Sequence, residues 1–137
     1  MTAQQDLSGT VQSGRGLGAS RMADPAVLHR LQDVAGFPIV PGTLNLRLPA
    51  APERDAHWHY VSAAEIGPEW QARTGQAGYF LARVTIAERY RGLAFQADEP
   101  AAPGYPPDLI ELFSEVLLRK ALDLSDGDHV VVRLGEA

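Results

Sequence analysis

Hydrophobic residues along this chain recur in short segments, and turn residues separate the segments at frequent intervals. Within most segments apolar and polar positions alternate, which is the period of a β-strand with one buried face. The pattern predicts strands at residues 9–13, 43–48, 57–64, 78–86, 92–96, 108–113 and 129–134. Many short strands joined by turns favour a mainly β fold, and we expect a small β-barrel with one or two short helices.

One segment instead has the period of a helix. Its apolar residues fall on a single stripe, formed by Val27, Leu28, Leu31 and Val34. Asp24 is a suitable N-cap, Pro25 is favoured at the first helical position, and Gly36 follows the last turn. We expect this helix to pack on the barrel as a lid. A shorter helix is predicted at residues 115–122, with a core-facing stripe of Val116, Leu117 and Leu122.

Length and composition limit the class of protein. A chain of 137 residues is one ordinary domain, and we expect a flexible terminus at residues 1–8 followed by a single barrel domain at 9–137. With 0 Cys, disulfides, thiolate metal sites and cysteine nucleophiles are excluded. The first residues lack the basic and apolar regions of a signal peptide, and no apolar run approaches the roughly 20 residues of a membrane span. We therefore expect a cytoplasmic protein without a membrane partner.

The charge of the chain further limits the classes of partner that we expect it to bind. The formal net charge is -5 at pH 7, which opposes a broad surface for duplex nucleic acid, so nucleic acid is a disfavoured partner. Lys120 is the only lysine, and no Gly-Lys-Ser or Gly-Lys-Thr sequence occurs. A Walker-type P-loop is therefore excluded.

The segment Pro-Gly-Thr-Leu-Asn-Leu-Arg-Leu at residues 41–48 combines a turn, a strand and two oxygen-bearing side chains. Because side chains alternate across a strand, Thr43 and Asn45 are expected on one face, about 7 Å apart along the chain, with the leucines on the other. A hydroxyl and a carboxamide can hold Mg2+ when phosphates and waters supply its remaining ligands. The alternative is an ordinary edge strand after a β-turn, with Asn45 bonded to its own backbone.

Two further features suggest polar chemistry. Gly14, Gly16 and Gly18 alternate in a loop where backbone N–H groups can approach phosphates closely, and Arg15 adds a cation; the alternative is a plain hairpin connection. Glu111 shares a strand face with Leu109 and Phe113, where its ionisation is costly unless a partner is present. Such a glutamate either contacts a ligand or lies at an edge.

Three segments in this order, GRGLGA at 14–19, PGTLNLRL at 41–48 and DLIELFSEVLLRKALDLSDGDHVVVRL at 108–134, resemble the archaeal-type CTP-dependent riboflavin kinase family. The resemblance implies a six-stranded cradle-loop barrel. It also implies a phosphotransferase that moves the γ-phosphate of CTP to the ribityl 5′-hydroxyl of riboflavin, giving FMN and CDP. The expected partners are thus small molecules, and the sequence does not predict an oligomeric state.

The resemblance assigns roles to individual residues. Thr43 and Asn45 match its magnesium ligands, and Glu111 matches a glutamate that contacts the flavin and could orient or deprotonate the attacking hydroxyl. We expect Tyr105, in the loop before Glu111, to lie against the isoalloxazine ring. The residues that match the nucleotide-binding stretches are Gly14, Arg15, Gly16, Leu17, Gly18, Ala19, Val116, Leu117, Leu118 and Arg119.

Other classes of protein remain open at this point. Leu17 stands where the family usually has a glutamate, and no residue between Pro100 and Pro107 matches the family's flavin-binding threonine, so a non-catalytic nucleotide- or flavin-binding barrel is the alternative. The C-terminal segment also resembles swapped-hairpin DNA-binding regulators, although its acidic residues disfavour DNA, namely Asp123, Asp126 and Asp128.

His57 and His59 form a His-x-His pair, which can begin a metal site if further ligands come from elsewhere. His29 and His129 lie in other segments, and nothing in the sequence fixes their distance from the pair. We therefore interpret the pair as part of a partly exposed strand rather than as a metal centre.

Overall fold

The computed structural model describes residues 6–13, 25–40, 43–62, 65, 78–97 and 106–135. The described part of the chain forms seven strands and two helices, in the order β1 (Asp6–Val11), α2 (Pro25–Ala35), β2 (Leu44–Arg47), β3 (Trp58–Val61), β4 (Tyr79–Ile86), β5 (Tyr90–Ala97), β6 (Leu109–Ser114), α5 (Leu118–Ala121) and β7 (His129–Leu134). Among the described helices, none is long and apolar enough to cross a membrane.

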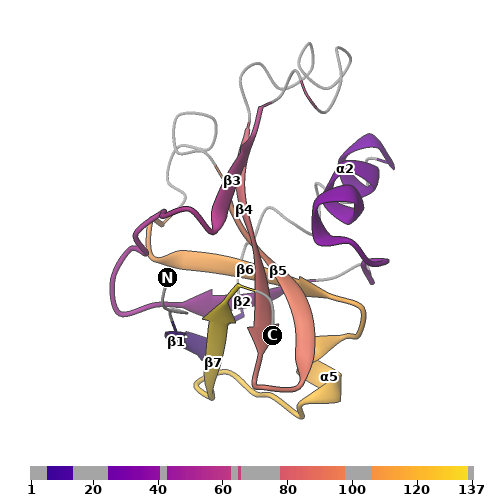
Figure 1. The fold of residues 1–137 in the computed structure, drawn as a ribbon. Helices are drawn as coiled ribbons and strands as arrows, with labels where there is room; N and C mark the ends of the chain where they lie inside the picture. Colours follow the sequence, from indigo (N-terminus) through magenta and orange to yellow (C-terminus); the bar gives the residue numbers. More distant parts are fainter. Residues whose placement is uncertain are drawn as a thin grey trace.

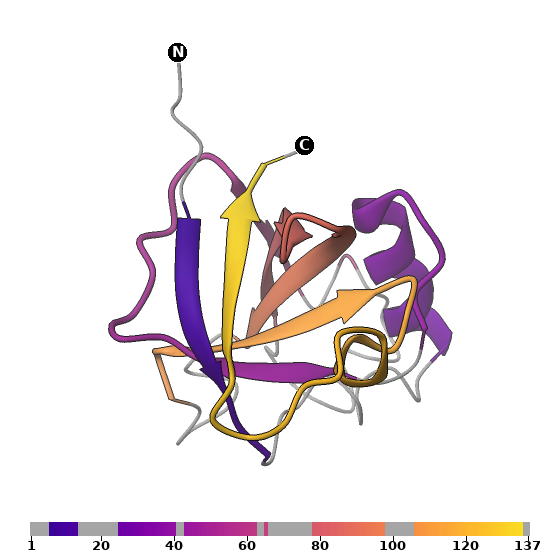
Figure 2. The ribbon, with the colours of Figure 1, turned by 90° about the horizontal axis from the view of Figure 1, so that it is seen from below.

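Six of the strands close into an antiparallel barrel (Figures 1 and 2). The strand order is β4-β5-β6-β2-β1-β7, and pairing of β7 with β4 completes the ring. Among the described strands, β3 pairs with β4 alone and extends the sheet beyond the ring. The mainly β, six-stranded barrel with short helices is therefore confirmed.

Two apolar layers lie on opposite sides of the barrel wall. Alternate side chains of all six barrel strands fill the interior, namely Val11, Leu44, Leu46, Ala82, Val84, Ile86, Ala94, Ile110, Leu112, Val130, Val132 and Leu134. The intervening residues of β4, β5 and β6 form an outer layer with α2, which includes Leu31, Ala35, Tyr79, Leu81, Leu93, Phe95, Leu109 and Phe113. As a result every residue of β6 is buried, whichever face it occupies.

α2 ends where the sequence predicts. Gly36 has φ +82°, a left-handed conformation that glycine adopts without strain, and its N–H donates to the Gln32 carbonyl at 2.9 Å. The Gln32 side chain accepts from the Ile39 N–H at 3.0 Å, and Arg83 Nε of β4 donates to the Val34 carbonyl at 2.8 Å. The C-terminal end of the helix is thus bonded to the barrel wall. Asp24, the predicted N-cap, lies outside the described residues.

Several predicted elements have other bounds in the structure: β3 ends at Val61 rather than at residue 64, and β5 begins at Tyr90 rather than at residue 92. β1 begins at Asp6 rather than at residue 9, because residues 6–10 pair with β7 along their whole length. The second helix spans only Leu118–Ala121, because Leu117 has an extended backbone at φ −76° and ψ 101°. Of the core-facing stripe predicted for this helix, Val116 and Leu122 do pack against the interior core. Leu117 does not, since it is 50% exposed and Leu118 is buried instead. The buried position moves from Leu117 to Leu118 because the helix begins only at Leu118.

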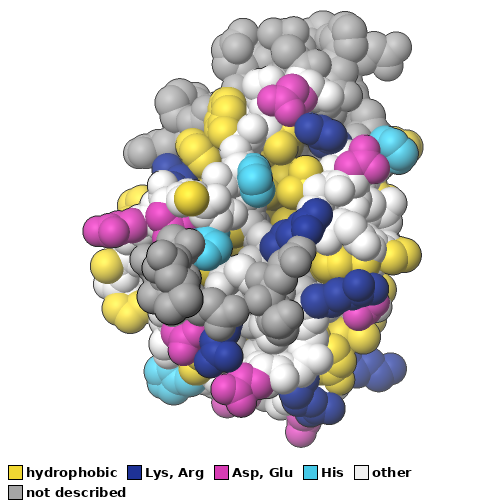
Figure 3. All heavy atoms as spheres, viewed as in Figure 1, with side chains coloured by type: hydrophobic (Ala, Val, Ile, Leu, Met, Phe, Trp, Pro, Cys, Tyr) yellow, Lys and Arg dark blue, Asp and Glu magenta, His cyan; other side chains and the backbone are white. Residues whose placement is uncertain are grey.

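A cleft of about 570 Å³ lies beside α2, between this helix and β3. Histidine and charged side chains border the hollow on this face of the molecule (Figure 3). The lining residues include Arg30, His57, His59, Glu65 and Arg83.

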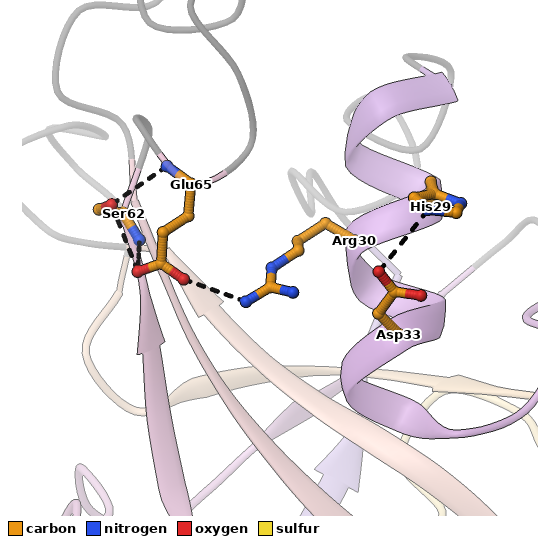
Figure 4. Close-up of polar contacts among 5 residues, drawn as sticks. All are labelled: His29, Arg30, Asp33, Ser62 and Glu65. Carbon is orange, nitrogen blue, oxygen red and sulfur yellow. Dashed lines mark hydrogen bonds and ion pairs between the residues drawn. The ribbon is translucent and has the colours of Figure 1, made fainter.

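An ion pair links α2 to the chain after β3 across this cleft (Figure 4). Arg30 Nη2 of the helix lies 3.1 Å from Glu65 Oε2, and the other carboxylate oxygen accepts from the Ser62 N–H at 3.3 Å. The Ser62 backbone bond and then Arg30 lower the pKa of Glu65 below its usual 4.5. The carboxylate therefore stays charged in neutral solution and ties the exposed side of α2 to the chain.

The first prediction concerns the packing of β5 against β6. A Cβ atom at Gly92 would collide with the Ile86 side chain and lie 2.7 Å from the Phe113 carbonyl oxygen, where the backbone has no room to move. Gly92→Ala should therefore lower the free energy of unfolding by about 1–3 kcal/mol in chemical denaturation. Val131→Ala is the control, because Val131 is 45% exposed on β7 and its loss should change stability by no more than about 0.5 kcal/mol. Equal stability of Gly92→Ala and the wild type would contradict this packing.

The second prediction concerns the link between α2 and Glu65. Because folding depresses the pKa of Glu65, its charge stabilises the fold above pH 4.5, and this contribution disappears as the pH falls through the folded-state pKa. Glu65→Gln should lower the melting temperature by about 1–3 °C at pH 7, since the ion pair is partly exposed, and by progressively less below pH 4.5. Glu88→Gln is the control, because Glu88 is 80% exposed and 3.8 Å from Arg133. A difference between wild type and Glu65→Gln that persists at pH 3 would rule out the charge as its cause.

Candidate functional site

Two residues singled out from separate segments of the sequence are direct neighbours in the barrel wall. Asn45 of β2 and Glu111 of β6 are paired across the strands, which places their Cβ atoms about 4.5–5.5 Å apart. Both point to the outer face, because the alternate residues Leu44, Leu46 and Ile110 fill the interior. The predicted metal ligand and the predicted flavin contact therefore share one site.

Glu111 is surrounded mainly by apolar side chains. Its own exposure is 0% and that of Asn45 is 7%. Phe95 of β5 is its cross-strand neighbour on the other side, and Leu109 and Phe113 flank it along β6 within the outer layer. Asn45 supplies a polar group on the remaining side. A carboxylate in this position requires hydrogen-bonding partners, because an ion removed from water without them is strongly destabilising.

Thr43 precedes β2 and is partly buried. It is two residues from Asn45, so the strand alternation favours the same outer face for both side chains. A hydroxyl, a carboxamide and a carboxylate thus follow one another along the β2–β6 seam. These are hard oxygen donors of the type that magnesium prefers, and two of the three are neutral.

The chain enters the predicted phosphate-binding loop beside this seam. The Gln12 N–H donates to the Asn45 carbonyl at 3.2 Å, so the end of β1 leaves the barrel next to Asn45. Gly14 to Ala19, which contain the three alternating glycines, lie outside the described residues, and their role stays a prediction.

The predicted base-binding stretch, Val116–Arg119, forms the start of α5 and the chain before it. Leu118 is buried in the barrel interior, whereas Arg119 is exposed. Arg119 Nη2 donates to Asp126 Oδ1 at 2.9 Å, and the same oxygen accepts from Ser13 Oγ at 2.9 Å. The end of β1 and the start of α5 are therefore connected through one carboxylate. The sequence does not reveal this connection, because Ser13 and Asp126 are 113 positions apart in the chain.

Gln96 is a second residue that the sequence did not mark. It is 1% exposed, and its amide donates to the Pro107 carbonyl at 3.0 Å and to the Leu109 carbonyl at 2.9 Å. Arg54 Nε donates to its oxygen at 3.2 Å. These bonds attach residues 107–109, at the start of β6, to the end of β5 and so fix the strand that carries Glu111. The only signal in the sequence was a glutamine at the end of an apolar strand. Tyr105, predicted against the flavin ring, lies outside the described residues.

The histidine pair has a different environment. His57 and His59 both line the cleft beside α2, and His57 Nδ1 lies 2.9 Å from Asp55 Oδ1, which also accepts from the His57 backbone N–H. That backbone bond is the main cause of the lowered pKa of Asp55. Among the residues that the structure describes, no three His, Asp or Glu side chains gather in a way that could hold a metal ion.

A second cleft of about 600 Å³ adjoins the first at Arg83 and Gly135. Its charged lining residues are Arg83, Glu88, Arg89, Arg91 and Glu115. Arg91 donates to both oxygens of Glu115, at 3.1 and 2.9 Å, and its guanidinium lies 4.8 Å from the centre of the Phe37 ring. Part of the wall of this cleft is therefore an internal ion pair near the end of α2.

Comparison with known proteins identifies relatives over nearly the whole chain. Residues 11–134 match the family model CTP-dep_RFKase, which carries the description "Domain of unknown function DUF120". The riboflavin kinase of Methanospirillum hungatei is 34% identical over 131 residues, which cover 93% of this chain and 57% of that protein. The riboflavin kinase of Ignicoccus hospitalis is 34% identical over 129 residues, 92% of this chain and 69% of that protein.

The riboflavin kinase of Aeropyrum pernix is similar in extent to this chain. It is 34% identical over 129 residues, which cover 93% of this chain and 94% of that protein. By contrast, the chain spans little more than half the length of the Methanospirillum protein. Since the family model matches residues 11–134, which include all three segments that carry the resemblance, the chain belongs to the CTP-dependent riboflavin kinase family.

Proposed function

We propose that this protein is a riboflavin kinase that transfers the γ-phosphate of CTP to the ribityl 5′-hydroxyl of riboflavin in the presence of Mg2+, giving FMN and CDP. The cross-strand pair of Asn45 and Glu111 is the observation that carries the proposal. The resemblance to the family assigns Asn45 to the metal ion and Glu111 to the flavin. Phosphoryl transfer requires that the metal-bound phosphate and the acceptor hydroxyl meet, and adjacent residues on one face satisfy this requirement.

Thr43 and Asn45 are the residues that would hold the metal ion. Their side chains provide neutral oxygens, and a magnesium ion that keeps several waters needs only one or two ligands from the protein beside the phosphates. When bound there, the ion would neutralise charge on the transferring phosphoryl group. The buried carboxamide of Asn45 fits this role, because its position is fixed by the β2–β6 ladder.

Glu111 is proposed to orient the ribityl hydroxyl and to accept its proton. The hydroxyl oxygen forms a bond to the γ-phosphorus as the bond to the β-phosphate oxygen breaks, and the hydroxyl proton passes to the carboxylate. A hydroxyl donor also stabilises a carboxylate that is shielded from water by Phe95, Leu109 and Phe113. Positioning is expected to contribute more to the rate than proton removal, as in other phosphoryl transfers.

The nucleotide is proposed to lie along Gly14–Ala19 and Val116–Arg119, with main-chain N–H groups on its phosphates. Tyr105 is proposed to cover the isoalloxazine ring. The use of CTP rather than another nucleotide rests on family likeness alone. Incubation with riboflavin, Mg2+ and each of CTP, ATP, GTP and UTP, followed by chromatography for FMN, tests both donor and acceptor.

The third prediction tests the metal ligand. Asn45→Ala removes a carboxamide that contributes little apolar packing, so the fold should persist with a modest loss of stability. CTP affinity measured by calorimetry should fall about tenfold or more at saturating Mg2+ and change little in EDTA, because only the metal-dependent part is lost. Thermal melting of the variant controls for folding. Unchanged affinity in Mg2+ would contradict the assignment of Asn45 to the metal.

The fourth prediction tests Glu111. Glu111→Gln keeps the size and the hydrogen-bonding capacity of the side chain but removes its charge. If the carboxylate accepts the proton, kcat for FMN formation should fall about 10²-fold or more, with a smaller change in the KM for riboflavin. A rise in the KM for riboflavin with unchanged kcat would make Glu111 a binding residue only. Absence of flavin binding at millimolar riboflavin, in protein that binds CTP, would leave a non-catalytic nucleotide-binding barrel.

A further inference from the structure

A single carboxylate oxygen joins two segments that are remote in the sequence. Asp126 Oδ1 accepts hydrogen bonds from Ser13 Oγ and from Arg119 Nη2, each at 2.9 Å. Ser13 is the residue immediately before Gly14, and Arg119 is the last residue of the stretch Val116–Arg119. Ser13, which precedes one proposed nucleotide-binding segment, and Arg119, which belongs to the other, therefore meet at Asp126.

The turn that carries Asp126 is itself firmly attached to the barrel. Gly127 N–H donates to the Val11 carbonyl and Val11 N–H donates to the Asp128 carbonyl, both at 2.8 Å. Within the turn, the Ser125 N–H donates to Asp128 Oδ2 at 2.8 Å. The backbone of residues 125–128 is thus bonded to the end of β1, and Asp126 projects from a fixed support.

Stability alone does not explain this arrangement. The side chains of Asp126 and Arg119 are 53% and 44% exposed, and ion pairs so open to water contribute little to folding. The Ser13 hydroxyl and then Arg119 lower the pKa of Asp126, so the carboxylate is charged at neutral pH and both bonds are charge-assisted. What these bonds fix is the position of Ser13 relative to Arg119.

We propose that Asp126 is a positioning residue that sets the spacing between the phosphate-binding and base-binding segments of the nucleotide site, acting through Ser13 and Arg119. This inference rests on the proposed function. A nucleotide that contacts both segments binds more tightly when their separation matches its length. Once its phosphates are bound, the base is held close to its own segment at a high effective concentration. If the carboxylate is removed, each segment keeps its own contacts, but the two no longer fit one nucleotide equally well.

The test uses Asp126→Ala in the chain of 137 residues, with Asp6→Ala as the matched control. Asp6 lies at the opposite end of β1, is 51% exposed, and pairs with Arg133 at 3.0 Å. Both variants thus lose one exposed ion pair at an end of the same strand. Asp126→Ala should raise the KM for CTP about 3- to 10-fold, with kcat and the KM for riboflavin unchanged, whereas Asp6→Ala should leave all three constants unchanged.

Two further measurements separate positioning from a general loss of structure. Cytidine and tripolyphosphate, each used as an inhibitor that occupies one segment, should inhibit wild type and Asp126→Ala equally. The double variant Ser13→Ala with Asp126→Ala should show no more than the effect of Asp126→Ala alone, because Ser13 acts through the same oxygen. Additive effects, an unchanged KM for CTP, or an equal rise in Asp6→Ala would overturn the inference.

The outcome also distinguishes this inference from the proposed function. If the wild type forms no FMN but binds CTP in calorimetry, the proposed reaction is wrong, and the affinities of the two variants for CTP test Asp126 in the same way. If the wild type binds no nucleotide, both proposals are overturned. A weaker affinity for CTP in Asp126→Ala, with Asp6→Ala unchanged, supports the positioning role in either assay.

Discussion

Closure of the sheet between β4 and β7 is the constraint on which the site depends. A closed ring of six strands turns one face of every strand inward, so that the interior takes the alternate apolar residues of each. All polar chemistry must then use the outer face or the loops. α2 covers part of the outer face, over β4, β5 and β6, with a second apolar layer. At the edge of this layer, between β6 and β2, Glu111 and Asn45 lie side by side.

This arrangement explains why a carboxylate can persist in a fully buried strand. Leu109 and Phe113 belong to the layer under α2, and their burial requires that the outer face of β6 be shielded from water along its length. Glu111 lies between them and is shielded with them. An apolar residue in its place would pack without the need for hydrogen-bonding partners, whereas a carboxylate needs them. Such a conflict between local environment and residue type is expected where a protein binds or transforms a ligand.

The fold was largely predictable from the sequence, and the site was predictable only in part. Alternation of side chains depends on neighbours in the chain, so β2 and β7 were predicted within two residues of their bounds. The late start of α5 was missed because Leu117 and Leu118 are both apolar, and only the tertiary packing selects Leu118 for burial. The pairing of Asn45 with Glu111 and the bonds of Asp126 and Gln96 join residues that are far apart in the chain, and no local pattern specifies them.

The two arginines of the C-terminal segment are both engaged in ion pairs within the fold. A surface for duplex DNA requires several cations that are available to phosphates. Arg133 pairs with Asp6 at 3.0 Å, and Arg119 pairs with Asp126 at 2.9 Å, so both arginines of this segment are compensated within the fold. A guanidinium has five N–H donors, and the bond to Asp126 uses one of those of Arg119. The net charge of the chain is -5. One guanidinium held in a fixed position is compatible with the proposed nucleotide site beside the Asn45–Glu111 seam.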